Sequence, residues 1–162
     1  MEIAVAPAQF SDWSALLGLL RSAYAYMAPL INPPSSLLRM DVAEFQEKAR
    51  HEALILALES SRILGCAFAV VREDCVYVGK LAVDESARRL GVARRIMEAA
   101  ETIARQNAKA YLELETLIEL LENHKTFAAL GFSKVAEKAY PGFDRPTSIT
   151  MRRPVRPAPT DA

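Results

Sequence analysis

The segment Arg88-Arg89-Leu90-Gly91-Val92-Ala93 is the most informative part of this chain. It follows the apolar run 76–83, which predicts a strand, and opens the segment 91–106, whose apolar spacing predicts a helix. The first N–H groups of a helix have no partner within the helix and carry a partial positive charge, so they attract anions. Gly91 has no Cβ to block a close approach. We therefore predict that this turn binds phosphate groups.

The rest of the chain predicts a single α+β domain. Its 162 residues can bury a hydrophobic core, and no linker or repeat divides them. We expect a mixed, mostly antiparallel sheet of about seven strands with about four helices, because a strand–helix–strand crossover lies within runs of strands. Residues 1–153 form the expected domain, and the proline-rich residues 154–162 an expected tail. The expected strands cover residues 3–5, 53–58, 63–71, 76–83, 111–115, 132–139 and 147–152.

Local signals place the ends of the helices. Pro29 should end a first helix that begins after Ser11 or Asp12, and a proline-containing loop should cover residues 30–38. Asp41 should cap a second helix that runs through residue 50. Glu101 and Arg105, four residues apart, should pair on the exposed face of the third helix.

A fourth helix is expected to end at Gly131. Thr116 and Glu119 have the spacing of a capping box, in which each side chain binds a backbone N–H at the start of a helix. This pattern predicts that the helix begins directly after a short strand over residues 111–115.

Composition disfavours several classes of protein. The 20 basic and 20 acidic residues cancel, which is not typical of a nucleic-acid-binding protein. No apolar run reaches the roughly 18 residues that span a membrane, and the N-terminus does not resemble a signal peptide. Cys66 and Cys75 lack a metal-ligand spacing, and pairing of residue 66 with residue 81 would place them at opposite ends of a hairpin. We expect free thiols, no metal and a cytoplasmic protein.

Three segments together resemble the GNAT superfamily of acetyl-CoA-dependent N-acetyltransferases. Residues 81–84 look like the end of the family's central strand, and residues 88–93 fit its pyrophosphate-loop pattern Gln/Arg-x-x-Gly-x-Gly/Ala. Asn123, followed by a helix that ends in Gly131-Phe132, looks like the second signature. The resemblance covers nearly the whole chain and implies splayed central strands.

The resemblance also implies roles for particular residues. Backbone groups of Leu81, Ala82 and Val83 would pair with the pantetheine arm as if it were an extra strand. The N–H of Val83 would polarise the acetyl carbonyl. Asn123 would contact the cofactor near the pantetheine and Phe127 would pack against it. The pyrophosphate would be bound by the loop residues Arg88, Arg89, Leu90, Gly91, Val92, Ala93 and Arg94.

The chain departs from the family pattern at Phe127. Many members have a tyrosine there that is thought to protonate the leaving thiolate, and phenylalanine has no proton to donate. The acceptor amine must lose its proton before it can attack, so a base would help. Glu115 is the first candidate for this base and Glu113 the second. His124 has a suitable intrinsic pKa but lies on the helix beside Asn123.

The implied function is transfer of an acetyl group from acetyl-CoA directly to a primary amine of an unidentified acceptor, more readily a small molecule than a protein. Tyr24, Met27 and Tyr140 are candidates for the acceptor site, although core packing explains the first two equally well. A non-catalytic acyl-CoA sensor and an interaction scaffold are the alternatives. Members of the family often dimerise through their last strands, so a homodimer is also expected.

Overall fold

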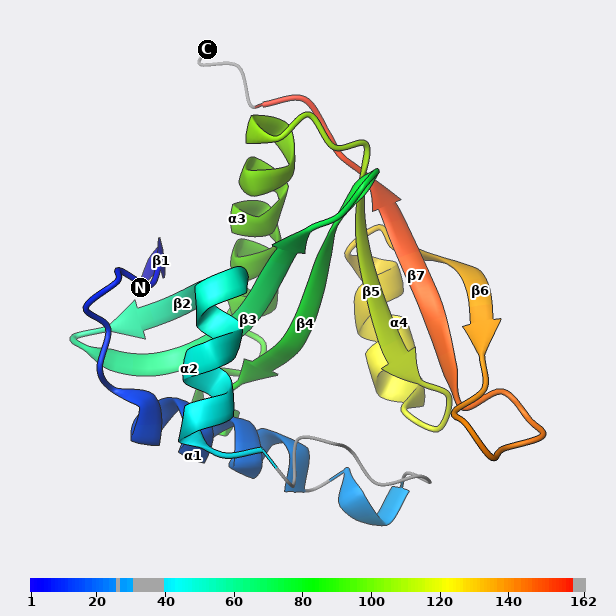
Figure 1. Ribbon diagram of the computed structural model, residues 1–162, viewed down its shortest axis with the longest axis horizontal. Helices are drawn as coiled ribbons and strands as arrows, with labels where there is room; N and C mark the ends of the chain where they lie inside the picture. The colour runs from blue at the N-terminus through cyan, green and yellow to red at the C-terminus, as the bar shows by residue number, and fades with distance from the viewer. Residues whose placement is uncertain (26, 31–39, 159–162) are drawn as a thin grey trace.

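The structure is a computed structural model that describes residues 1–25, 27–30 and 40–158. Within these residues the chain forms one seven-stranded sheet and four α-helices (Figure 1). The strands are β1 (Glu2–Val5), β2 (Ala53–Glu59), β3 (Arg62–Val71), β4 (Cys75–Val83), β5 (Tyr111–Leu117), β6 (Ser133–Lys138) and β7 (Ser148–Pro154). The helices are α1 (Trp13–Ala25), α2 (Val42–His51), α3 (Val92–Gln106) and α4 (Leu121–Ala129).

The sheet has the order β1-β2-β3-β4-β5-β7-β6, and the predicted mixed, mostly antiparallel architecture is confirmed. Strands β4 and β5 are the parallel pair, and they pair only over residues 75–77 and 111–113. Beyond these three residue pairs the strands diverge, so the sheet consists of two halves that separate toward one end (Figure 1). The predicted splay of the central strands is therefore present.

Strand β4 contains a bulge at the point where it leaves β5. Its register against β3 shifts by one residue between Gly79 and Ala82, so Lys80 and Leu81 together oppose one residue of β3. Lys80 takes the left-handed φ of 54°, which is unusual for a residue with a side chain. The shift pairs Cys66 with Ala82, so the predicted pairing with residue 81 is wrong by one position.

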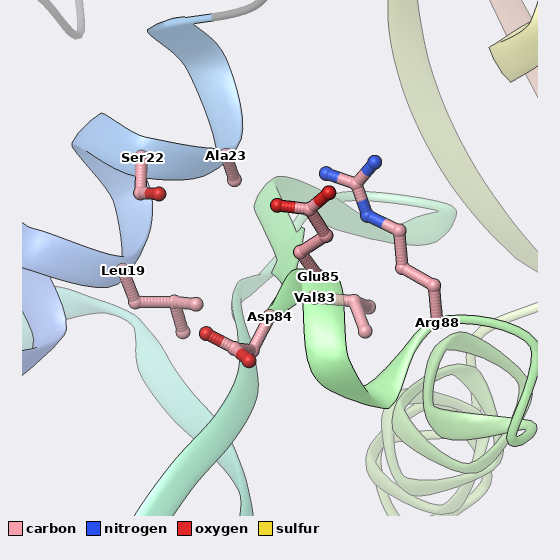
Figure 2. Close-up of a pocket in the computed structure, with 7 residues that line it drawn as sticks. All are labelled: Leu19, Ser22, Ala23, Val83, Asp84, Glu85 and Arg88. Carbon is pink, nitrogen blue, oxygen red and sulfur yellow. The ribbon is translucent and has the colours of Figure 1, made fainter.

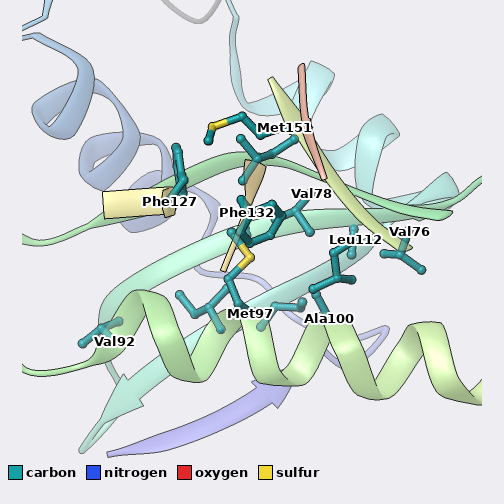
Figure 3. Packing of buried hydrophobic residues seen from close by; sticks show 14 of the residues in the cluster. Val76, Val78, Val92, Met97, Ala100, Leu112, Phe127, Phe132 and Met151 are labelled. Carbon is teal, nitrogen blue, oxygen red and sulfur yellow. The ribbon is translucent and has the colours of Figure 1, made fainter. Parts of the chain in front are cut away.

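The helices cover both faces of the sheet. Helices α1 and α2 pack on one face through a cluster that includes Leu16, Leu20 and Phe45 (Figure 1). Helix α3 packs on the other face, where Met97 and Ala100 meet side chains of β4 and β5 (Figure 3). Helix α4 adds side chains to this second cluster. The splay thus lies between two helical layers.

Several local predictions are confirmed. The Asp41 side chain accepts a hydrogen bond from the Glu44 N–H at 3.0 Å and caps α2. Helix α4 ends with Gly131 at φ 94°, a left-handed value that glycine adopts without strain. Cys66 and Cys75 are buried free thiols. The predicted loop over residues 30–38 lies, after Leu30, outside the described residues.

Two predicted helix boundaries are wrong. Helix α1 ends at Ala25, before Pro29, and Pro29 lies in a short 3-10 turn, Ala28–Leu30. Thr116 belongs to β5, which continues to Leu117 because it pairs with β7 along all seven of its residues. Helix α4 therefore begins at Leu121 without a side-chain cap, and the predicted capping box does not form.

Glu101 does not lie on the exposed face of α3 as predicted. Only 3% of its surface is exposed, and its carboxylate pairs with Arg105, Arg153 and Arg156. Arg156 comes from the expected tail, whose first part is attached to the domain. Pro154 is the last residue of β7, and the next N–H donates to the carbonyl of Ala110 at 2.8 Å.

None of the helices in the described part of the chain is long and apolar enough to cross a bilayer.

Candidate active site in the splay of the sheet

A cavity of about 450 Å³ occupies the splay between β4 and β5. Its walls come from α1, α2 and the two strands, from α3 and α4, and from the β6–β7 turn. A pocket of this size is typical of small-molecule sites. The structure brings six of the predicted site residues together around it, namely Tyr24, Leu81, Glu115, Asn123, Phe127 and Tyr140.

The edge of β4 that borders the splay presents unpaired backbone groups. The N–H of Asp84 donates to the carbonyl of Leu64 on β3 at 2.7 Å. Successive residues of a strand point their backbone groups to opposite sides, so the N–H of Val83 points away from β3. Strand β5 does not pair with β4 at this level. The N–H of Val83 is therefore on the side of β4 that faces away from β3, and its role as an oxyanion contact stays a prediction.

Tyr24 connects α1 to the bulge. Its hydroxyl donates to the backbone carbonyl of Leu81 at 3.2 Å. This bond occupies the backbone carbonyl of Leu81. Tyr24 therefore fixes the position of the bulged backbone from the side of α1.

The loop before α3 has the geometry of an anion site. Gly91 adopts φ 78° at the N-cap of α3, and a Cβ built on it would meet no atom within 4 Å. No side chain caps the helix, so the N–H groups of its first turn, Val92, Ala93 and Arg94, remain for a ligand. Arg89 also has a left-handed φ of 65°, and Leu90 is 68% exposed. These features favour the predicted pyrophosphate loop.

A second, smaller cavity of about 100 Å³ lies between this loop and α1. It brings Val83 and Arg88 together with Glu85 and with side chains of α1 (Figure 2). Five of the predicted cofactor residues are thus divided between the two cavities. Leu81, Asn123 and Phe127 line the splay cavity, whereas Val83 and Arg88 line the smaller one.

Asn123 and Phe127 approach the splay from α4. Because α4 begins at Leu121, Asn123 lies in its first turn, and it lines the cavity. Phe127 is 9% exposed and packs edge-to-face against Phe132, with ring centroids 6.2 Å apart. His124 is turned to the backbone, where its Nε2 lies 3.0 Å from the carbonyl oxygen of Leu117.

The two candidate bases have different surroundings. Glu115 lines the cavity, and its carboxylate forms an ion pair with Lys138 of β6. Glu113 is 8% exposed and pairs with Arg152 at 2.8 Å and with Arg72 at 3.3 Å. It does not line the cavity. The geometry therefore favours Glu115 over Glu113 as a group that can reach a bound acceptor.

Tyr140 lines the cavity from the β6–β7 turn. Met27 does not line the cavity; it is 5% exposed and packs against Leu120, which does. Lys48, Tyr77 and Thr116 are among the further lining residues that sequence reasoning missed. Burial raises the pKa of Tyr77 to about 12, with a further contribution from the charge of Glu115. No local pattern could have identified these residues, because the site forms only when α2 and both strands come together.

Comparison with known protein families agrees with this geometry. The model of the acetyltransferase (GNAT) family matches residues 15–132. This chain belongs to the GNAT family. The match includes the β4 strand, the loop before α3 and the segment through Gly131-Phe132, so the GNAT signatures noted in the sequence lie within it. No curated protein matches the chain significantly.

Solved structures share the GNAT fold over nearly the full chain. A GNAT acetyltransferase from Staphylococcus aureus Mu50 is 13% identical, with a TM-score of 0.75 over 96% of this chain and 99% of its own. An aminoglycoside 6'-N-acetyltransferase in complex with coenzyme A is 14% identical, with a TM-score of 0.73 over 99% and 100%. The ribosomal-protein-S18-alanine N-acetyltransferase of Escherichia coli is 18% identical, with a TM-score of 0.69 over 99% and 97%. At these identities the likeness shows the fold.

Proposed function

We propose that this GNAT protein transfers an acetyl group from acetyl-CoA directly to a primary amine. The observation that carries the proposal is the splay. An unpaired strand edge, a cavity lined from both helical layers and, after β4, an uncapped helix N-terminus occur together there. A long ligand with a pyrophosphate at one position and a thioester at another fits this arrangement.

Acetyl-CoA supplies a thioester whose carbonyl carbon the amine attacks, with loss of the thiolate. In our proposal the N–H of Val83 donates to the carbonyl oxygen as negative charge develops there. Leu81 and Ala82 belong to the strand edge that aligns the pantetheine arm, and Asn123 and Phe127 contact this arm from α4. Arg88 and the loop from Arg89 to Arg94 bind the pyrophosphate.

Glu115 is our proposed base for the acceptor amine, acting directly or through one water. Its ion pair with Lys138 has to open or rearrange for this role. Tyr24 and Tyr140 border the space from which the amine would approach. The acceptors named for the structural neighbours, aminoglycosides and an alanine of a ribosomal protein, are two starting points for an acceptor panel.

The test is the affinity for acetyl-CoA, measured by isothermal titration calorimetry. In Gly91→Asp, the new carboxylate would project into the open space before α3 and repel the pyrophosphate, so we expect at least about tenfold weaker binding. Gly142→Asp is the matched control. Gly142 also has a left-handed φ, 90°, and open space around its Cβ position, but it lies in the β6–β7 turn.

Both variants carry similar backbone strain, so a difference between them reports on the loop itself. If Gly91→Asp and the wild type bind acetyl-CoA with equal affinity, the loop does not contribute to the cofactor site. Absence of any acetyl-CoA binding to the wild type would contradict the proposed function as a whole.

A non-catalytic acyl-CoA sensor is the second candidate. Two observations favour it: Phe127 has no proton to give to a leaving thiolate, and the nearest candidate base is already paired with Lys138. Coenzyme A release in the presence of amines, followed with a thiol reagent, separates the two functions. Binding without release would support the sensor.

A further inference from the structure

Two lysines border the side of the splay cavity that faces α2. Lys48 comes from α2 and Lys80 from the bulge of β4. Lys80 is half-buried, and the charges of Lys48 and Glu52 both act on it, which places its ammonium group on the α2 side of the sheet. This is the face opposite to α3, whose N-terminus we assign to the pyrophosphate.

The other charges around this part of the cavity are already paired. Lys48 forms an ion pair with Glu52 at 2.7 Å, and Glu115 forms one with Lys138. Lys80 makes no ion pair or side-chain hydrogen bond with any residue in the described ranges 1–25, 27–30 and 40–158. The acceptor side of the cavity therefore carries one uncompensated positive charge.

Holding such a charge away from water is unfavourable, and the surroundings of Lys80 reflect this. Burial, and then the neighbouring charge of Lys48, lower the pKa of Lys80 below the ordinary value for lysine. The backbone of Lys80 is also in the left-handed region, where glycine would be less strained. An unpaired charge on a strained backbone inside a cavity suggests that its partner is a ligand.

We propose that the amine acceptor carries an anionic group, a carboxylate or a phosphate, and that Lys80 binds this group with help from Lys48. This inference rests on the proposed acetyl transfer at the same site. The anion would lie toward α2, and the amine toward Val83 and Glu115. An acceptor with several positive charges would be disfavoured, because it would meet Lys48 and Lys80 at close range.

The experiment is calorimetric binding of matched amines to the protein saturated with coenzyme A, so that it does not depend on turnover. One series compares α-amino acids of different size with their amides, for example L-phenylalanine and L-phenylalaninamide. A second compares 2-aminoethyl phosphate with ethanolamine and separates phosphate from carboxylate recognition. Spermidine represents a polycationic amine. We expect the anionic member of at least one series to bind at least about tenfold more tightly than its neutral counterpart.

Substitutions test whether Lys80 causes the preference for anionic amines. Lys80→Met should remove it, with about a tenfold or greater loss of affinity for the anionic amine and less than about a twofold change for the amide or ethanolamine. Lys80→Arg keeps the charge and should retain most of the preference. Lys134→Met is the control, because Lys134 lies on β6 outside the cavity and pairs with Glu137.

The inference is overturned if neutral amines or spermidine bind as tightly as the anionic ones, if no anionic amine binds, or if Lys80→Met retains the full preference. Failure of the proposed function gives a different result. In that case an anionic amine binds with the Lys80-dependent preference, but coenzyme A is never released from acetyl-CoA.

Discussion

Glu101 and Lys80 are ionisable side chains on opposite faces of the same sheet, and their surroundings differ completely. Glu101 is almost fully buried and pairs with three arginines. Lys80 is half-buried and has no charged partner among the described residues. The ion pairs of Glu101 stabilise the fold by linking separate segments. The unpaired charge of Lys80 is instead available to a ligand, as we propose.

The pKa values of the two groups also reflect this difference. Burial by itself would raise the pKa of Glu101, but the hydrogen bonds of Arg156 and the nearby charge of Arg153 outweigh it and lower the pKa. For Lys80, burial and the charge of Lys48 both lower the pKa, and the charge of Glu52 does not outweigh them. The first environment stabilises a charge at neutral pH, and the second opposes one.

The largest expected effect is on the Glu101 cluster. Glu101→Gln removes the central charge and leaves the buried Arg153 without its charged partner, so the free energy of unfolding should fall by about 3 kcal/mol. Chemical denaturation measures this change. Glu98→Gln, at an exposed position one turn earlier on α3, is the control and should change stability by less than about 0.5 kcal/mol. Equal effects of the two substitutions would show that the cluster does not hold the fold.

The same cluster predicts a dependence on pH. Because the pKa of Glu101 is lowered in the folded state, its contribution is complete above the unfolded pKa, near 4.5, and is lost as the pH falls through the lower folded value. The wild type should therefore lose more stability than Glu101→Gln between about pH 5 and pH 2. Parallel stability curves over this range would contradict the assignment.

A smaller effect is expected for Arg156→Ala. The Arg156 guanidinium contacts Glu101 at 3.0 Å but is 56% exposed, and its backbone N–H, which donates to the same carboxylate, remains after substitution. We expect a loss of about 1 kcal/mol in the free energy of unfolding. Arg50→Ala, which removes an exposed ion pair with Glu47, is the control and should have less effect.

The smallest effect has the opposite sign. Lys80→Met replaces an unpaired charge with an apolar chain of similar length, so stability at neutral pH should rise slightly, by less than about 1 kcal/mol. This gain in stability should shrink as the pH rises, because wild-type Lys80 then loses its proton and no longer buries a charge. Thermal unfolding of Lys80→Met and of the Lys134→Met control measures the difference. A clear loss of stability would mean that Lys80 has a structural partner.

The parts of this structure that could be predicted from the sequence are those determined by neighbouring residues. Gly91 before the apolar face of α3, Asp41 before α2 and Gly131 after α4 each mark a boundary through local geometry. Together with the GNAT resemblance, these signals were sufficient to predict the sheet, the splay and the loop before α3.

The remaining features depend on contacts between distant segments. Glu101 has the spacing of an exposed partner for Arg105, and only the return of β7 brings Arg153 and Arg156 to it. Thr116 and Glu119 have the spacing of a cap, but pairing with β7 extends β5 through Leu117 and overrides that signal. Likewise, the position of the β4 bulge, and hence of Lys80, follows from the register against β3 and not from composition.

The short contact between β4 and β5 has a mechanical consequence. These strands share three residue pairs, whereas β5 and β7 share seven, so a force that pulls the two halves of the sheet apart would meet little resistance at their junction. After β7, the N–H of Val155 donates to Ala110, which precedes β5, and Arg156 pairs with Glu101 of α3, so this segment ties β7 to α3. Tension between the halves would therefore pass through this C-terminal segment, and the cavity could widen at its open end without the molecule coming apart.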